Sequence, residues 1–233
     1  KRYQDFVRAG AALTEAQNKN GLYNSYLRAF RWASDRIGDD GGVVAFVTNG
    51  GWLDGNATTG VRKSFGNEFS DLYIFNLRGD AHLTGERRRK EKGNVFGAGT
   101  RTPVAISVLV RNPEAAHRGR IHYRDIGDYL EEKEKLAIIR DFGSTRGIAE
   151  ADGWTQIEPD EHGDWLNQRD ASFDQFIKIG DKKDKTAETL FETYSAGVKT
   201  QRDAWCYNRS RADLERNIGA MIDTYNDELA KAR

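Results

Sequence analysis

The chain has 233 residues, of which 31% are charged and 38% hydrophobic, and its formal net charge at pH 7 is zero. This composition is typical of a globular protein with room for one α/β domain and an appendage, and zero net charge excludes a uniformly basic nucleic-acid binder. The single Cys206 excludes a disulfide framework and a multi-cysteine zinc site. No run of residues reaches transmembrane length, so we expect a cytoplasmic protein without membrane partners. Because the sequence begins at Lys1, we expect a piece of a longer polypeptide.

The first recognisable element follows a polar stretch, residues 1–20, which predicts an N-terminal arm. Residues 21–38 have helical spacing, and a glycine turn leads from them into the apolar run 43–47. The helix face expected to meet the core carries Leu22, Tyr26, Phe30, Ala33 and Ile37. An apolar run without alternation predicts a strand that is covered on both faces. Helix, turn and covered strand together indicate one step of a parallel α/β sheet.

A loop rich in glycine and asparagine, residues 49–56, follows this strand. It is either a ligand-binding loop, because open parallel sheets bind ligands at the carboxyl ends of their strands, or a plain turn cluster. A second helix is expected over about 58–69, and a second covered strand over 72–77.

Residues 78–101 predict a long loop, and loops of this length are often functional. Its basic residues are either contacts for DNA phosphates or an ordinary solvated charge run. They are Arg87, Arg88, Arg89, Lys90 and Arg101.

Residues 102–110 and 121–126 predict a third and a fourth strand, and the short link between them predicts an antiparallel pair. A helix to about Phe142 follows, with Asp128 and Glu131 as a cap. Residues 143–189 are rich in Gly, Asp and Glu and predict a linker region that holds a short helix around 173–179. The last part of the chain, residues 190–233, is expected to be strand-like or irregular at first and to close with a helix from Ser210.

The sequence contains no recognisable catalytic constellation. The four histidines have no metal-ligand spacing, and there is no Gly-x-Ser-x-Gly elbow or phosphate loop. We therefore predict no catalytic, cofactor-binding or metal-binding residue within this chain.

Several segments nevertheless resemble a known family, the adenine-N6 DNA methyltransferases of the Type I-like kind. The details are most similar to single-polypeptide Type ISP restriction-modification enzymes, over about residues 20–140 and again over 190–229. The segments that carry the resemblance are 22–37 (LYNSYLRAFRWASDRI), 41–53 (GGVVAFVTNGGWL), 61–65 (VRKSF), 72–79 (LYIFNLRG), 102–110 (TPVAISVLV) and 195–205 (SAGVKTQRDAW).

The resemblance implies an α/β fold, the second half of a Rossmann-like methyltransferase sheet. This sheet would be mostly parallel with an antiparallel edge pair and would be followed by a helical, partly irregular C-terminal segment. The implied domains are 21–142 for the methyltransferase half, 143–189 for the linker region and 190–233 for the start of a target-recognition region. The family's Asn-Pro-Pro-Tyr/Phe motif and the strand and turn that bind S-adenosylmethionine are missing here. The fragment alone should therefore be inactive and should bind this cofactor weakly or not at all.

The function implied by the resemblance is transfer of a methyl group from S-adenosylmethionine to an adenine flipped out of double-stranded DNA. Phe96 matches the family's base-stacking position, and its alternative role is a loop anchor that packs on the sheet. The glycines after Phe96 are superficially similar to a cofactor turn, but no strand precedes them. The family implies that nuclease and helicase-like domains share the polypeptide. The alternative hypothesis is a non-catalytic DNA-binding or interaction module on an α/β scaffold.

Overall fold

The computed structural model describes residues 20–231 apart from positions 169, 171, 173, 174, 194, 196, 198 and 201. The predicted arm, except Asn20, and parts of the segments 173–179 and 195–205 lie outside the described residues. The chain divides into two compact units, Lys1–Asp170 and Ala171–Arg233. Within the described part, no helix is both long and apolar enough to cross a membrane.

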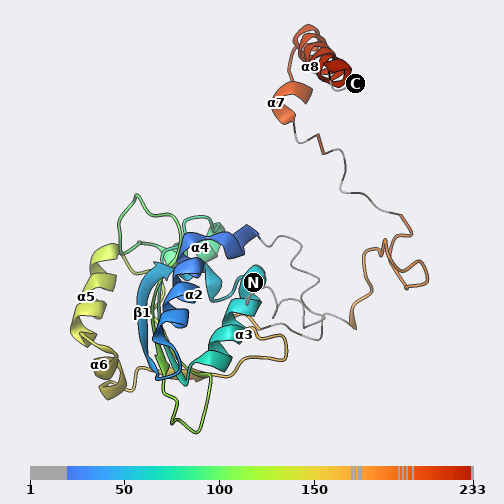
Figure 1. Cartoon of the computed structure of the whole chain (residues 1–233). Helices are drawn as coiled ribbons and strands as arrows, with labels where there is room; N and C mark the ends of the chain where they lie inside the picture. Colours follow the sequence, from blue (N-terminus) through green and yellow to red (C-terminus); the bar gives the residue numbers. More distant parts are fainter. Residues whose placement is uncertain are drawn as a thin grey trace. The chain divides into compact units, whose positions relative to one another are not determined.

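The first unit is built on a five-stranded sheet with the order β1-β3-β2-β4-β5 (Figure 1). β3 pairs antiparallel with both β1 and β2, β4 pairs parallel with β2, and β5 pairs antiparallel with β4. The sheet is therefore mixed and mostly antiparallel. The strands are β1 (Gly42–Asn49), β2 (Asp71–Arg78), β3 (Val104–Arg111), β4 (Arg120–Asp125) and β5 (Thr155–Ile157).

The four predicted strands are confirmed, but the prediction of a mostly parallel sheet is wrong. β1 and β2 run in the same direction and are joined through helix α3 (Thr59–Glu68), yet β3 lies between them. The predicted antiparallel pairing of the third and fourth strands is also wrong, because β2 separates β3 from β4. Apolar runs specify which residues form strands, whereas nothing in their periodicity specifies which strands are neighbours.

Helices cover the two faces of this sheet (Figure 1). On one face lie α2 (Ser25–Ile37) and α3, and on the other lie α5 (Glu132–Phe142) and α6 (Thr145–Glu150). The short 3-10 turns η2 (Asn20–Tyr23), η3 (Gly50–Trp52) and η4 (Asn56–Thr58) accompany the first face. The predicted 78–101 loop is only partly irregular, because it contains α4 (Gly85–Glu91). Its sequence has good helix formers but no apolar stripe, so hydrophobic periodicity does not reveal it.

The core on the α2 side is dominated by aromatic rings. Phe30 of α2 meets Trp52 at a centroid distance of 5.8 Å, and Trp52 meets Phe65 of α3 at 5.4 Å. Trp165, from the segment after β5, also packs on Trp52 at 5.4 Å. The predicted inner face of α2 is therefore confirmed, since Phe30 is fully buried and the other four members pack in the same core.

The opposite face of the sheet is covered unevenly. Phe75 and Leu77 of β2 are buried against the α5 and α6 side. On β1, by contrast, Val43 and Val47 are 60% and 53% exposed. The prediction that this strand is covered on both faces is thus wrong within the described chain. An apolar cavity of about 170 Å³ opens on the same face of the sheet, next to α6.

A buried arginine joins the segment after β5 to α3 and to the turns before it. Arg62 of α3 is almost fully buried and donates to the carbonyl oxygens of Trp52, Gly55 and Gly163, each at 3.0 Å. Its remaining nitrogen forms an ion pair with Asp164 at 2.8 Å. These bonds hold residues 163–164 on α3, within the compact unit Lys1–Asp170.

Among its described residues, the second unit contains two helices, α7 (Asp203–Cys206) and α8 (Arg211–Lys231). The closing helix predicted from Ser210 is confirmed by α8. α7 lies in a stretch that was predicted to be strand-like or irregular. Of the segment before it, the described residues include one parallel bridge, between Lys178 and Thr189.

Candidate nucleic-acid interface

The carboxyl ends of β1, β2 and β4 meet at one rim of the sheet, because these three strands run in the same direction. A polar cleft with a volume of about 420 Å³ opens at this rim. A second hollow of about 290 Å³ shares several lining residues with it and adds Asn49, Gly50 and Gly51. The glycine- and asparagine-rich loop after β1 therefore lies where the sequence argument places a ligand-binding loop.

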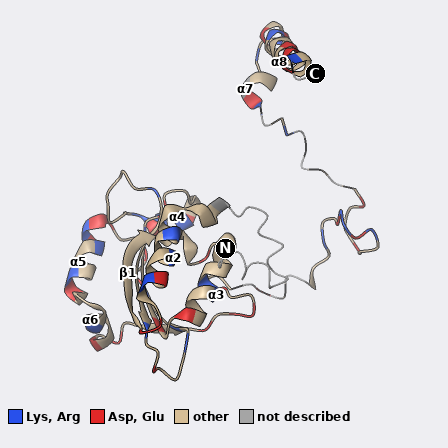
Figure 2. Cartoon of the chain, in the orientation of Figure 1, with Lys and Arg blue, Asp and Glu red and all other residues tan. Residues whose placement is uncertain are grey.

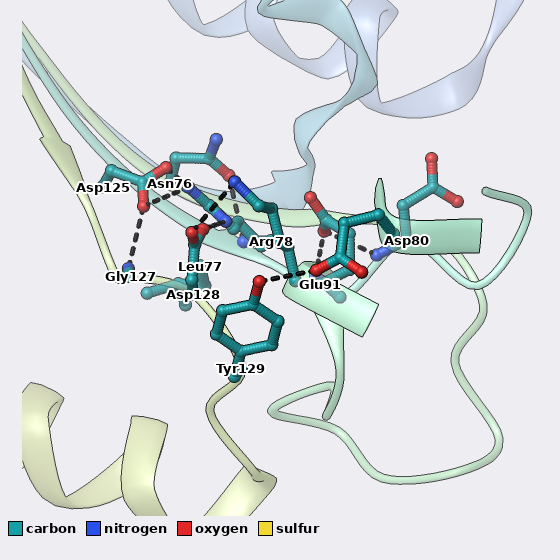
Figure 3. A network of polar contacts seen from close by, with 12 residues as sticks. Asn76, Leu77, Arg78, Asp80, Glu91, Asp125, Gly127, Asp128 and Tyr129 are labelled. Atoms are coloured by element: carbon teal, nitrogen blue, oxygen red, sulfur yellow. Dashed lines mark hydrogen bonds and ion pairs between the residues drawn. The ribbon is translucent and has the colours of Figure 1, made fainter. Parts of the chain in front are cut away.

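Arg78, the last residue of β2, organises the floor of this cleft (Figure 3). It binds Asp125 at the end of β4 with two nitrogens, at 2.9 and 2.8 Å, and also pairs with Asp128. Burial alone would lower the pKa of Arg78, but the hydrogen bonds to Asp125 and Asp128 outweigh it and raise the pKa. The backbone of Arg78 has a φ of 56°, a value that non-glycine residues seldom adopt and that this network holds in place.

Two further side chains complete the floor. Asn76 accepts a hydrogen bond from the Arg78 backbone N–H at 3.0 Å and donates to the hydroxyl oxygen of Tyr123 at 3.0 Å. That hydroxyl donates to Asp125 at 3.2 Å. Burial raises the pKa of Tyr123, so this phenol stays protonated at neutral pH. The hydrogen-bond donors and acceptors of the floor thus bind one another. The floor is therefore a rigid support for the cleft more than a surface that binds a ligand.

Helix α4 is fixed to the rim by the loop that follows β4. Lys90 pairs with Asp128 at 3.2 Å, and the Tyr129 hydroxyl donates to Glu86 at 2.5 Å. The predicted cap of α5 is wrong as a consequence. Asp128 is used by Arg78 and Lys90, and the helix begins at Glu132 with Glu131 as its N-cap, whose N–H donates to the Glu134 carboxylate at 2.7 Å.

The segment between α4 and β3 is held by buried polar groups. Asn94 donates to the carbonyl oxygens of Gly79 and Thr102 at 3.2 and 3.0 Å. Its own amide oxygen accepts from the N–H of Phe96 at 3.0 Å. Val95, next to it, is 9% exposed and belongs to the core on the α5 side. This irregular segment is therefore fixed at several points.

Lys135 of α5 is the most deeply buried of these anchors. It is 0% exposed, and its ammonium group donates to the carbonyl oxygens of Leu77, Glu91 and Gly93 at 2.9, 2.9 and 2.7 Å. Burial lowers the pKa of Lys135 to about 8. One side chain thereby joins α5 to the end of β2 and to both ends of the turn after α4. Sequence reasoning missed it, because a lysine in an amphipathic helix looks the same whether it is buried or exposed.

The predicted phosphate contacts do not all lie free on this rim. Figure 2 shows basic residues on α4. Arg88 donates to the Lys92 carbonyl at 2.7 Å, Arg89 pairs with Glu86 at 3.1 Å, and Lys90 is bound to Asp128. The side chains of Arg87 and Arg101 make no hydrogen bond or ion pair with the described residues. Arg87 also lines the cleft.

Phe96 is 64% exposed. The alternative role as a loop anchor that packs on the sheet is therefore contradicted, and its neighbour Val95 has that role instead. The structure thus presents Phe96 to solvent on a segment whose backbone is fixed from both sides. Within the described part of the chain, no group of three or more His, Cys, Asp or Glu side chains is arranged to bind a metal ion.

Known proteins resemble both units. Residues 189–233 match the Type ISP C-terminal specificity domain. The ATP-dependent Type ISP restriction-modification enzyme LlaBIII bound to DNA is 40% identical with a TM-score of 0.82, over 97% of this chain and 14% of that one. A nuclease-deletion mutant of the Type ISP enzyme LlaGI in complex with a DNA substrate mimic is 40% identical with a TM-score of 0.81, over 99% of this chain and 18% of that one.

A third structure, the DrdV–DNA complex, is 31% identical with a TM-score of 0.77, over 97% of this chain and 22% of that one. No curated protein matches the chain. The chain thus spans less than a quarter of the length of each of the three solved relatives.

Replacing Lys135 by methionine should lower the free energy of unfolding by about 2–4 kcal/mol, because three buried carbonyl groups lose their donor. Lys133→Met, at an exposed position of the same helix, is the control and should stay within about 0.5 kcal/mol of wild type. Urea denaturation measures both.

The same pair tests the depressed pKa. Between pH 8 and 10.5 the folded protein has lost the Lys135 proton and the unfolded chain still binds it, so the stability of the wild type rises with pH relative to Lys135→Met. A stability difference between the two proteins that stays flat over this range would contradict the assigned burial of a charged group.

Proposed function

We propose that this chain, which is homologous to a region of Type ISP restriction-modification enzymes, is a DNA-contacting part of such an enzyme. The observation that carries the proposal is the match of residues 189–233 to the specificity domain, in a chain that is 40% identical to enzymes whose structures hold DNA. Its partner would be double-stranded DNA. The remaining domains of the polypeptide would supply what this chain lacks.

The first unit would meet the DNA with α4 and with the segment after it. Since the net charge of the chain is zero, attraction to phosphates must come from cations whose side chains are not already bound to another group of the chain. Arg87 and Arg101 meet that condition, whereas Arg88, Arg89 and Lys90 already have partners. Arg87 and Arg101 would therefore be the phosphate contacts of this rim, and the other three would mainly fix α4.

Phe96 would be the aromatic contact of the same surface. A phenylalanine that is 64% exposed on a fixed backbone loses little conformational entropy on binding, and its ring can stack on any base. Stacking on a base flipped out of the helix remains its proposed role.

A second candidate function is the one implied by the family resemblance, the downstream half of a methyltransferase domain. The observation that favours it is the uncovered side of β1. β1 is an eight-residue strand at the edge of the sheet and exposes Val43 and Val47. Long apolar edge strands invite pairing with another strand. The strand and helix that would cover β1 would come from the part of the polypeptide that binds S-adenosylmethionine.

Replacing Arg87 or Arg101 by alanine should weaken binding of the chain to duplex DNA of any sequence. Each change should reduce the slope of log K against log salt by about 1, because one phosphate contact is lost. The control is Arg89→Ala, which should change the slope less since Arg89 is bound to Glu86. Fluorescence anisotropy at several salt concentrations measures the slopes. Equal slopes for all three variants and the wild type would exclude this rim as a phosphate contact.

Val47→Lys tests the second candidate. In the chain alone it should change the free energy of unfolding by less than about 0.5 kcal/mol, because the side chain is exposed. In the full-length enzyme it should sharply reduce adenine methylation, since a lysine cannot be buried there without a partner. Leu136→Lys, at an exposed position of α5, is the control. Full methylation by the Val47→Lys enzyme would rule out a covered β1.

A further inference from the structure

The solvent-facing side of α2 carries a stripe of three large side chains. Arg28, Trp32 and Arg36 follow one another at intervals of four residues, so they lie on one line along the helix. Their side is opposite to the one that packs in the core. Trp32 is 62% exposed, and both arginines are exposed as well. The described part of the chain therefore leaves this stripe uncovered.

The two arginines of the stripe keep their charges available for another molecule. The guanidinium carbon of Arg36 lies 5.3 Å from the centre of the Trp32 ring. Neither Arg28 nor Arg36 forms an ion pair with a carboxylate of the described residues. The neighbouring Arg31, by contrast, binds two carboxylates of the chain, at 2.7 and 2.6 Å. Because the ring and both free cations belong to one packed helix, they lose little conformational entropy on binding.

The surroundings of the stripe favour a protein partner over DNA. Tryptophan and arginine are among the residues that contribute most to protein–protein interfaces. Asp35 lies beside the stripe with 60% of its side chain exposed, and Asp39 and Asp40 follow the helix at exposed positions. These negative charges would repel phosphates. The stripe also ends next to the amino end of β1, whereas the surface proposed to contact DNA lies at the carboxyl ends of the strands.

We propose that this stripe docks onto an acidic protein surface in another part of the same polypeptide. Arg28 and Arg36 are eight residues apart, which is about 12 Å along a helix. The partner surface should therefore present two carboxylates at about this spacing, with an apolar hollow between them for the Trp32 ring. The chain covers 14%, 18% and 22% of the three solved relatives, so a parent enzyme of their length has further domains to supply it. The inference rests on the proposed function only in placing the chain within such an enzyme, and it requires no DNA.

The test is oxidation of tryptophan side chains by hydroxyl radicals, followed by mass spectrometry, in the full-length enzyme without DNA and in the 233-residue chain. Trp32 should react about tenfold more slowly in the full-length enzyme, as expected if about one molecule in ten is undocked. Trp52, which is 0% exposed, is the buried reference. Arg28→Glu combined with Arg36→Glu should restore the reactivity of Trp32, because the acidic partner then repels the helix. Arg140→Glu, at an exposed position of α5, is the control and should leave the protection unchanged.

The same double substitution in the 233-residue chain corrects for any direct effect of the arginines on the ring. Equal reactivity of Trp32 in the two proteins would overturn the proposal, and so would protection that persists after Arg28→Glu and Arg36→Glu. Protection that appears only with added duplex DNA would make the stripe a DNA contact instead. Protection of the 233-residue chain that is lost on dilution would make the occupant a second copy. A failure of the proposed DNA contact shows separately, in the salt slopes of Arg87→Ala and Arg101→Ala.

Discussion

The position of the segment between β2 and β3 depends on one constraint. Its backbone carbonyl oxygens lie outside any strand or long helix, so they must accept hydrogen bonds from donors elsewhere in the fold. A single ammonium group, that of Lys135, donates to two of them, the carbonyls of Glu91 and Gly93, and to the carbonyl of Leu77 near the end of β2. A buried backbone carbonyl without a partner costs about 1–3 kcal/mol, so a charged lysine can be stable there despite its burial. Without it, the turn after α4 would lose its buried contacts with α5. Every group through which the first unit is proposed to contact DNA lies on, or next to, this segment.

The carboxylates at the rim divide the basic residues into two sets. Asp125 and Asp128 bind Arg78, and Asp128 also binds Lys90, so these cations fix the ends of β2 and β4 and hold α4 between them. Arg87 and Arg101 remain without such partners in the described chain. A neutral protein can in this way present a local positive surface. Arg87 and Lys90 come from one basic cluster in the sequence, and only the carboxylate beside Lys90 distinguishes an anchor from a contact.

The sequence predicted well which residues form helices and strands, but it predicted poorly which strands lie next to one another. The inner face of α2, the extent of α3 and the four longer strands follow from hydrophobic periodicity, and the structure confirms them. The strand order does not follow, because β1, β2 and β3 are all apolar and any of them could lie in the middle. The deepest polar anchors, Arg62 and Lys135, were missed because an arginine or a lysine in a helix carries no local sign of burial.

The sequence predicted the carboxyl rim of the sheet only in part. The loop after β1 and the basic cluster were identified as candidate ligand contacts, and both lie at the carboxyl rim, where Arg87 lines the cleft. The contribution of Leu83, Leu166 and Asn167 was not foreseen, because Leu83 is far in the chain from Leu166 and Asn167, and they meet only when the segment after β5 returns to the sheet. The resemblance to Type ISP enzymes is confirmed for a region of those enzymes, whereas the methyltransferase half remains a proposal.

The most direct test of the account is hydrogen exchange of the backbone amides, measured for the chain with and without duplex DNA. If the carboxyl rim of the first unit contacts DNA, residues 79–101 should gain protection together with part of residues 189–231. Protection confined to residues 189–231 would mean that only the second unit contacts DNA, and it would contradict the function assigned to the rim.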